Sequence, residues 1–487
     1  MIRRRYHCGH RSPAGSHWSD RLAGRPLAPL GPVVAWGLCL GGLKTQQGVT
    51  SWAPDSLRES VGRREQFSLE WALKEGMDMP GSPDASEYMR GLPPAADRLV
   101  TREVRWQDPP HNRWAFQHVR EFIPTACIHR GPGPASALER RPRNVLGVPC
   151  GLPGDKKLTV GEWLSDSVTD GFLVLHRGRI VAEHYFNHMH PHTTHLLQSV
   201  SKSIVGTLAG ILSSRDQLRL DGRVTDYVPE LEGSSFEGAT VRQLLDMRTG
   251  TRFNEDYEDP TAEVRVYETV IGWAPPLEPM AASGLYEYIA QLENASDHGG
   301  PFAYRSILTD LLGWVLERAS GLRLPELLSR EIWAPLGAEF DADVTVDRHG
   351  SALADGGICA TLRDMGRFGQ MYLQGGVFNG RSIVPHEWVA DCRIGNDDVR
   401  RAFTDSPEGA GYPGWFYRNK WWVKDSGNGV FMGLGIYGQM VFIHSAAEMV
   451  GVKFSTWPVA DDDEFVRRDV RGMEAIAEWL GAAATAR

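Results

Sequence analysis

The stretch Ser199-Val-Ser-Lys-Ser-Ile-Val-Gly-Thr-Leu-Ala-Gly-Ile-Leu212 decides the fold of this chain. Its apolar residues recur at the three- and four-residue spacing of a helix. Glycine and alanine stand among them, and such small side chains let a helix approach a sheet closely. The stretch therefore predicts a buried helix packed against a sheet, with Ser199 at its beginning.

A β-hairpin is expected before this helix. Phe172 to Tyr185 contains two β-type runs around a Gly-containing turn, which is the pattern of two antiparallel strands. Residues 187–195 are then expected to form a loop. Helical periods dominate at about 240–345, strands return at 430–444 and 448–457, and a helix follows at about 464–480. This order predicts an α+β fold with a mostly helical insertion at about 240–345.

The N-terminal residues differ from the rest of the chain. Residues 1–66 are rich in Arg, Gly, Pro and Ser and show no sustained period, which predicts a disordered extension, or sequence upstream of the true start. A composition typical of a folded domain begins near Phe67, so residues 67–487 are assigned to the folded domain. Residues 130–143, rich in Pro, Gly and Arg, are typical of a linker.

Charge and cysteine content exclude several classes of partner. The formal net charge is -9 and the arginines are scattered, so no basic stripe for nucleic acid is present. The apolar run Val33 to Leu43 is too short to span a bilayer and lies late for a signal peptide, so no membrane partner is expected. Six cysteines without paired spacing favour free thiols and a cytoplasmic location, with export as the alternative. A homodimer is compatible with the sequence.

The chemistry centres on Ser199-Val-Ser-Lys202. Residues three apart on a helix share a face, so Lys202 is expected to reach the Ser199 hydroxyl. The backbone N–H of Ser199 would lie at the positive end of the helix dipole. A lysine acts as a base only when neutral, which requires burial and suitable neighbours. The alternative is a serine helix cap followed by an exposed lysine.

Tyr304 is the candidate for a second hydroxyl that would relay the proton to the leaving group. It precedes the predicted helix at 308–319, and a tyrosine in such a turn can point into a cleft. The alternative is a tyrosine that packs on the core with its hydroxyl in water.

Several segments resemble one family when they are read in order from Trp106 to the C-terminus. They are Arg113-Trp-Ala-Phe-Gln-His118, Ser199-Val-Ser-Lys-Ser203, Leu244-Leu-Asp-Met-Arg-Thr-Gly250, Tyr304-Arg-Ser306 with Leu312-Gly-Trp314, and Gly435-Ile-Tyr-Gly-Gln439. They are similar to the penicillin-recognising serine hydrolases, above all to the 6-aminohexanoate-dimer (nylon oligomer) hydrolases. The resemblance implies a β-lactamase/transpeptidase-like antiparallel sheet flanked by helices.

The same resemblance implies the roles of individual residues. Ser199 would be the acylated nucleophile, Lys202 its base and Tyr304 the proton relay. Ser306 would stand where most of the family has Asn in its Tyr-x-Asn motif. The backbone N–H groups of Ser199 and Ile436 would form the oxyanion hole. The substrate-binding set would be Tyr257, Ser306, Leu434 and Gly435, and no cofactor or metal is implied.

Two positions need separate interpretation. Gly433-Leu-Gly435 falls on the family's Lys-Thr-Gly signature, so no cation stands at 433 to bind a β-lactam carboxylate. Tyr257, in Asn254-Glu-Asp-Tyr-Glu-Asp259, matches a loop of the nylon-oligomer hydrolases in which a tyrosine hydrogen-bonds the substrate amide. The equally weighted alternative is a solvated acidic turn whose tyrosine covers a helix end.

The histidines at 184–195 and Cys359 do not indicate a functional site. Five histidines gather in 184–195, and His184 with His188 has the spacing of a metal pair. The surrounding Pro and Thr residues indicate a loop, and no further ligand completes the set. Cys359 is interpreted as a small buried residue.

Three functions stay open from sequence. They are an amidase or esterase acting on a small linear amide or ester, a β-lactamase or D-alanyl-D-alanine peptidase, and a non-catalytic binding protein of the same fold. The second is disfavoured by Gly433, since a buried substrate carboxylate would lack a partner. The third is disfavoured because Ser199, Lys202 and Tyr304 occur together.

Overall fold

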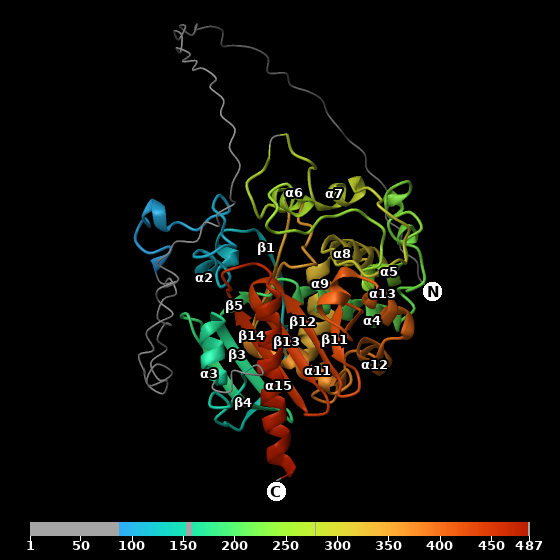
Figure 1. Ribbon diagram of the computed structural model, residues 1–487. Helices are drawn as coiled ribbons and strands as arrows, with labels where there is room; N and C mark the ends of the chain where they lie inside the picture. The colour runs from blue at the N-terminus through green and yellow to red at the C-terminus, as the bar shows by residue number, and fades with distance from the viewer. Residues whose placement is uncertain (1–86, 152–157, 278, 486–487) are drawn as a thin grey trace, which may run out of the picture. The chain divides into compact units, whose positions relative to one another are not determined.

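The computed structural model describes residues 87–151, 158–277 and 279–485 (Figure 1). The predicted extension at 1–66 lies outside these residues, as does the apolar run Val33 to Leu43. Among the residues described, no helix has the length and apolar character needed to cross a membrane.

An eight-stranded sheet forms the centre of the fold, with strand order β10-β11-β12-β13-β14-β3-β4-β2. Neighbouring strands are antiparallel apart from β2 and β4, which run parallel. Its strands are β2 (Glu139–Arg140), β3 (Thr169–His176), β4 (Arg179–Tyr185), β10 (Phe416–Arg418), β11 (Trp421–Asp425), β12 (Val430–Gly435), β13 (Gln439–His444) and β14 (Met449–Ser455).

The predicted hairpin is confirmed as β3 and β4. The expected strand at 430–444 is two strands, because a short turn at Ile436–Gly438 reverses the chain between β12 and β13. The linker predicted at 130–143 contains β2, which adds an edge strand to the sheet beside β4.

Helices cover both faces of this sheet (Figure 1). On one face lie α4 (Val200–Ser213) and α11 (Leu362–Leu373), and on the other lie α3 (Val160–Asp166) and α15 (Asp463–Thr485). The predicted helices at 200–212 and 464–480 are confirmed by α4 and α15. The expected α+β architecture, an antiparallel sheet flanked by helices, is therefore confirmed.

The small residues of α4 are predicted to allow close packing on a sheet, but its glycines contact other elements. Every residue from Val200 to Leu212 is buried. A Cβ on Gly206 would lie 2.7 Å from the backbone oxygen of Asn419, and one on Gly210 would lie 2.3 Å from the Trp388 ring. The glycines therefore allow close contact with the β10–β11 turn and with α12 (His386–Ile394), and not with a strand. Helix α4 does contact the sheet, through β12.

A second, four-stranded antiparallel sheet has the order β1-β6-β7-β5. Its strands are β1 (Thr125–Ile128), β5 (Thr194–Leu196), β6 (Ala342–Thr345) and β7 (Ile358–Thr361). Strand β5 overlaps the loop expected at 187–195, so that prediction was wrong at its last two residues. A strand of three residues is too short to show a period-2 pattern, and β5 is held by its pairing with β7.

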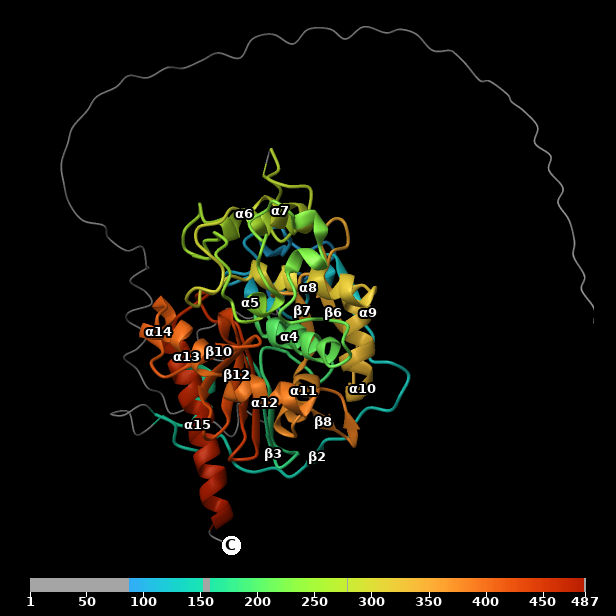
Figure 2. The same ribbon diagram turned by 90° about the vertical axis from the view of Figure 1, so that its right-hand side faces the viewer.

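Between residues 240 and 345 the chain is mainly helical. Helix α8 packs on both α4 and α5, and α6 and α7 lie beyond α8, farther from the eight-stranded sheet (Figure 2). The helices of this region are α5 (Val241–Leu245), α6 (Glu263–Val270), α7 (Leu285–Gln291), α8 (Ile307–Ser320), α9 (Leu324–Leu328) and α10 (Ala334–Leu336).

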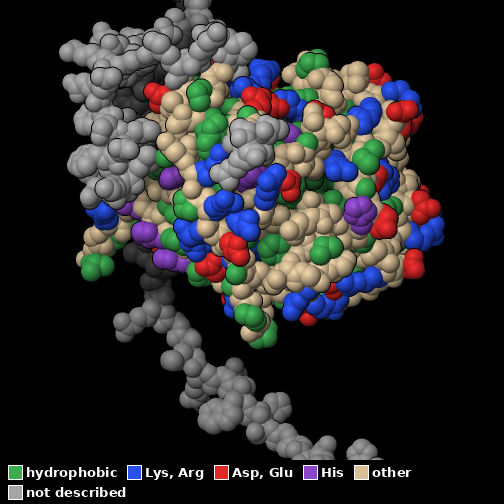
Figure 3. Space-filling view, turned by 90° about the horizontal axis from the view of Figure 1, so that it is seen from below, with side chains coloured by type: hydrophobic (Ala, Val, Ile, Leu, Met, Phe, Trp, Pro, Cys, Tyr) green, Lys and Arg blue, Asp and Glu red, His purple; other side chains and the backbone are tan. Residues whose placement is uncertain are grey.

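Besides four 3-10 turns at Ala96–Arg98, Val119–Glu121, Val224–Asp226 and Pro229–Leu231, six further short elements belong to the described residues. They are α2 (Asn112–Ala115), α13 (Asp397–Thr404), α14 (Pro407–Gly411), the hairpin β8 (Val377–Phe378) with β9 (Arg381–Ser382), and a π-helical turn at Ser329–Trp333. On the face seen in Figure 3, basic and acidic side chains are intermixed.

Candidate active site

Ser199 lies at the junction between the four-stranded sheet and α4. Strand β5 ends at Leu196, and Ser199 is the residue directly before the first turn of α4. Gln198, between them, has a φ of 47°, a conformation that residues with a side chain adopt rarely and that concentrates at functional sites. The sharp turn places Ser199 at the mouth of a cavity rather than inside the helix.

Lys202 reaches Ser199 as the three-residue spacing predicts. Its Nζ lies 2.7 Å from the Ser199 Oγ, and the side chain is about 1% exposed. The same Nζ donates to the backbone oxygen of Asp355 at 2.9 Å and lies 3.8 Å from the Asp355 carboxylate. The exposed-lysine alternative is therefore excluded, because burial and two acceptors hold the amine against the serine hydroxyl.

Asp355, which the sequence analysis missed, is fixed by a buried network. Asp310 accepts hydrogen bonds from the backbone N–H groups of Ala354 and Asp355, at 2.8 and 3.1 Å. The Tyr267 hydroxyl contacts Asp310 at 2.7 Å and Asp355 at 3.1 Å. Burial, followed by the charge of Asp355, raises the pKa of Asp310. This network holds the turn that carries the acceptor of Lys202.

Tyr304 closes the other side of the Ser199–Lys202 pair. Its ring centroid lies 5.2 Å from Lys202 Nζ, and Tyr304 lines the same cavity as Ser199. The ring stacks on Trp422 with centroids 5.7 Å apart. Burial, and then the charge of Glu255, raise the pKa of Tyr304 well above its ordinary value. The hydroxyl is thus neutral at physiological pH and lies beside the serine rather than in bulk water.

Glu255, a second residue missed from sequence, joins Tyr257 to Ser306. Its carboxylate accepts from the backbone N–H of Ser306 at 2.5 Å, from the Ser306 hydroxyl, and from the Tyr257 hydroxyl at 2.8 Å. Burial raises the pKa of Glu255, and the charge of Lys202 partly opposes that rise. The solvated-turn alternative for Tyr257 does not fit, since its half-buried ring lines the cavity beside Ser199.

Strand β12 brings the predicted oxyanion residues together. A Cβ on Gly435 would lie 3.0 Å from the backbone nitrogen of Ser199, so the end of β12 touches the beginning of α4. Ile436 follows directly, and Tyr437 after it has a φ of 58°. Among the turn, loop and cap hydrogen bonds of the described residues, none has the backbone N–H of Ser199 or Ile436 as its donor.

Gly433, at the position where the resemblance to β-lactam-processing enzymes implies a cation, is enclosed by neighbouring side chains. A Cβ at this position would lie 2.9 Å from the Ser203 hydroxyl and 3.1 Å from Val441. Ser203 is itself buried and donates to the backbone oxygen of Lys420 at 2.7 Å. A lysine at 433 would therefore require Ser203 to move.

A cavity of about 500 Å³ opens above these residues. It is lined by Ser199, Tyr257, Tyr304, Trp422, Leu434, Gly435 and Ile436. Carboxylates contribute much of the remaining wall, namely Glu255, Asp256, Glu408, Asp461 and Asp463. The predicted site residues other than Lys202 and Ser306 thus line one cavity with an acidic wall. Lys202 is buried against Ser199, and Ser306 lines a small neighbouring pocket together with Ser199 and Tyr257.

The histidine stretch does not reach this cavity. His195 is buried, with Nε2 3.1 Å from Asp170 and Nδ1 3.0 Å from the backbone oxygen of Leu196. Asp170 also pairs with Arg113 at 2.5 Å, so His195 belongs to a structural network. Cys359 is buried as predicted.

Comparisons with known proteins agree with this arrangement. The Beta-lactamase family model matches residues 166–472. The 6-aminohexanoate-dimer hydrolase of Paenarthrobacter ureafaciens is 39% identical over 357 residues, which cover 73% of this chain and 88% of the relative.

Solved structures share the fold. One is a Bacillus anthracis protein with the provisional name 6-aminohexanoate-dimer hydrolase, at a TM-score of 0.73 and 26% identity, covering 80% of this chain and 98% of its own. Another is EstCE1, described as a hydrolase with promiscuous acyltransferase activity, at a TM-score of 0.52 and 18% identity, covering 65% of this chain and 96% of its own. The family match spans the region that carries Ser199, Lys202 and Tyr304, and this chain belongs to the Beta-lactamase family.

Proposed function

We propose that this chain is a serine hydrolase that cleaves linear amide or ester bonds through an acyl-enzyme at Ser199. The observation that carries the proposal is the contact of 2.7 Å between Lys202 Nζ and Ser199 Oγ, made by a buried amine beside the Tyr304 hydroxyl. A nucleophile and a base within hydrogen-bond reach, with the base oriented by a third group, is the arrangement that activates a serine.

In the proposed acylation step, neutral Lys202 takes the Ser199 proton as the oxygen attacks the substrate carbonyl carbon. The carbonyl oxygen gains negative charge, and the backbone N–H groups of Ser199 and Ile436 stabilise that charge. Two such donors lower the barrier most when they have no other partner, because no hydrogen bond must break first. The position of Ser199 at the start of α4 adds the positive end of the helix dipole.

Tyr304 completes the proposed cycle. As the tetrahedral intermediate collapses, Tyr304 passes a proton to the leaving amine or alcohol, and Lys202 restores the proton of Tyr304. An acyl group then remains on Ser199. Water, activated by the same pair, attacks the acyl carbon and releases the acid. The raised pKa of Tyr304 supports a role in which the hydroxyl carries a proton between heavy atoms rather than staying ionised.

The cavity supports a substrate that is small and carries a positive charge. Asp256, Glu408, Asp461 and Asp463 line its wall, so a protonated amine at the end of a linear chain would meet acceptors there. The relative named 6-aminohexanoate-dimer hydrolase supports the same class of substrate, a linear amide with a terminal amine. A cytoplasmic location also stays part of the proposal, supported by the free cysteines among the described residues.

A β-lactamase or peptidase function has less support. The family's β-lactam-processing members are expected to use a cation at the position of Gly433, and the Ser203 hydroxyl fills the space a side chain there would need. A binding protein without activity has no need to keep a buried lysine against a serine hydroxyl, since a buried amine costs desolvation energy.

A substrate panel tests the proposal. The 6-aminohexanoate dimer, a p-nitrophenyl ester and a chromogenic cephalosporin would be compared for wild type and Ser199→Ala. The expected result is turnover of the linear amide and the ester, little turnover of the cephalosporin, and none by Ser199→Ala. Cephalosporin hydrolysis as efficient as ester hydrolysis would favour the β-lactamase function. No turnover of any substrate would favour the binding protein.

A further inference from the structure

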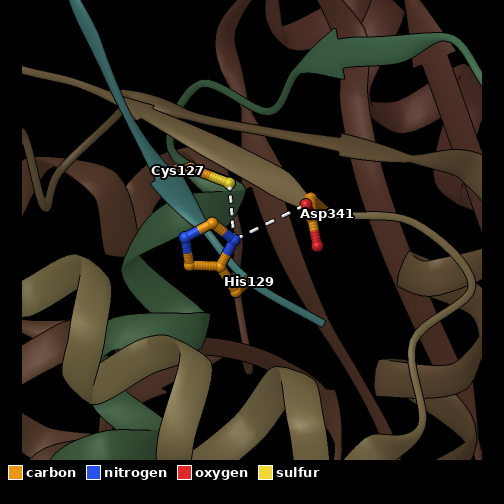
Figure 4. Close-up of side chains that lie close together, drawn as sticks. All are labelled: Cys127, His129 and Asp341. Atoms are coloured by element: carbon orange, nitrogen blue, oxygen red, sulfur yellow. Dashed lines mark hydrogen bonds and ion pairs between the residues drawn. The ribbon is translucent and has the colours of Figure 1, made fainter. Parts of the chain in front are cut away.

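A cluster of three side chains lies at the edge of the four-stranded sheet, away from the cavity. Cys127 is on β1, His129 follows that strand, and Asp341 precedes β6 (Figure 4). Strand β1 is the edge strand of the order β1-β6-β7-β5, whereas β5, at the opposite edge, leads into Ser199. The cluster is therefore separate from the proposed active site.

Strand register explains why the three side chains meet. Residues two apart on a strand point to the same face, so Cys127 and His129 share a face of β1. The antiparallel pairing sets Cys127 opposite Asp343 and Ile128 opposite Ala342, which continues to His129 opposite Asp341. Ile128 and Ala342 are buried on the other face. Cys127 is thus held within the paired strands, and His129 and Asp341 each lie one residue beyond the last paired residues of β1 and β6.

The two distances from the His129 ring nitrogen match those of a tetrahedral zinc site. His129 Nδ1 lies 3.3 Å from Cys127 Sγ and 3.6 Å from an Asp341 carboxylate oxygen, and the three ligand atoms lie within 4.8 Å of one another. Zinc bonds of about 2.3 Å to sulfur and about 2.0 to 2.1 Å to nitrogen or oxygen give tetrahedral edges of roughly 3.3 to 3.6 Å. A single ring nitrogen that faces a thiol and a carboxylate can hydrogen bond well to only one, whereas a cation between them binds all three.

Neighbouring groups orient the ligands. The other Asp341 oxygen accepts from the backbone N–H of Arg130 at 2.8 Å, and the backbone oxygen of His129 accepts from the Ser329 hydroxyl at 2.6 Å. Outer contacts of this kind fix ligand orientation in metal sites. Asp343 is instead paired with Arg120 at 2.6 Å, which leaves a three-ligand set.

We propose that Cys127, His129 and Asp341 form a zinc site with a fourth position open to water or an incoming ligand. A thiolate, an imidazole and a carboxylate suit a cation of intermediate softness, and this excludes Ca²⁺ and Mg²⁺, which prefer oxygen ligands alone. The bound ion ties β1 to the residue before β6. The histidines at 184–195 take no part in it.

Cobalt titration of the full chain, purified without a histidine tag and freed of metal, tests the site. One Co²⁺ per chain should bind and give the near-ultraviolet charge-transfer band of a cobalt–thiolate bond, and Zn²⁺ should displace it. Cys127→Ser should abolish the band, and His129→Ala or Asp341→Asn should weaken binding by at least about tenfold. These side chains are exposed, so the melting temperature without metal should stay unchanged and report intact folding.

His190→Ala is the matched control, because His190 is an exposed histidine outside the cluster. It should keep both the stoichiometry and the band. Absence of stoichiometric binding, a band that survives Cys127→Ser, or loss of binding in His190→Ala would each overturn the proposal. None of these outcomes depends on hydrolysis, so the zinc site and the proposed function are tested independently.

Discussion

The carboxylate of Glu255 holds the backbone N–H of Ser306 at 2.5 Å, across 51 residues of sequence. It also accepts from the Tyr257 hydroxyl at 2.8 Å. One half-buried carboxylate therefore ties the turn that carries Tyr304 to the loop that carries Tyr257. Tyr304 is proposed to protonate the leaving group, and the Tyr257 hydroxyl is expected to accept from the substrate amide N–H, so Glu255 is a positioning residue for both.

Replacing Glu255 with Gln should lower kcat/KM for a linear amide. The glutamine oxygen cannot serve all three donors, and its NH₂ group would face the N–H of Ser306. Loss of one hydrogen bond to a charged group costs about 1.5 to 3 kcal/mol, which corresponds to roughly a 10- to 150-fold drop in rate. In the double variant Glu255→Gln with Tyr257→Phe, the loss of transition-state stabilisation should be smaller than the sum of the losses in the two single variants. Fully additive losses would show that Glu255 does not act through Tyr257.

Stability should also respond to pH through Glu255. Because burial raises the pKa of its carboxyl in the folded state, the folded protein holds more protons than the unfolded chain between about 4.3 and the raised value. The free energy of unfolding therefore falls as pH rises through this window. Urea unfolding at several pH values across this window should show that the free energy of unfolding falls less steeply with pH in Glu255→Gln than in wild type. Glu258→Gln, an exposed change in the same loop, should keep the wild-type slope, and identical slopes in all three proteins would contradict this account.

Lys202→Arg should reduce turnover of every substrate by about 100-fold or more. Arginine keeps the positive charge but does not lose a proton at physiological pH, so it cannot serve as the base. Steady-state rates on the ester and the amide provide the measurement. Lys424→Arg is the control, since Lys424 pairs with Glu474 on the other face of the molecule's sheet. Near wild-type rates for Lys202→Arg would mean that another group takes the serine proton.

Tyr257→Phe should impair amide cleavage more than ester cleavage. The Tyr257 hydroxyl donates to Glu255, which leaves its oxygen lone pairs to accept from a substrate amide N–H. An ester has no such N–H, and p-nitrophenolate leaves without protonation. One lost hydrogen bond of about 1 to 3 kcal/mol predicts roughly a 5- to 150-fold drop for the amide.

The control for this change is Tyr412→Phe, a tyrosine in the same cavity whose hydroxyl binds Asp463 at 2.6 Å. Comparing kcat/KM for an amide and an ester of the same acyl group separates the two effects. Equal losses on both substrates, or none on either, would return Tyr257 to a structural role.

Local pattern was enough to predict the main elements and part of the site. The helical spacing of Val200, Ile204 and Leu208 predicts α4, and the paired β-type runs predict β3 and β4. The three-residue spacing of Ser199 and Lys202 predicts their contact, because helix geometry alone brings the two side chains together.

Long-range contacts could not be predicted in this way. Glu255 and Asp355 touch the site through partners 51 and 153 residues away, and no local period records such a distance. His195 belongs to a run that reads as a loop, yet β5 pairing with β7 buries it. The pairing of β1 with β6 likewise makes neighbours of Cys127 and Asp341, which the sequence separates widely.

The most direct test of the proposed function is the site of covalent labelling. An activated serine attacks the phosphorus of a fluorophosphonate probe and displaces fluoride, and peptide mapping by mass spectrometry locates the adduct. We expect one adduct per chain on Ser199, no adduct on Ser199→Ala, and an unchanged adduct on Ser203→Ala, whose hydroxyl points to the backbone oxygen of Lys420 instead. An adduct on a different serine, or labelling that persists in Ser199→Ala, would contradict the acyl-enzyme at Ser199.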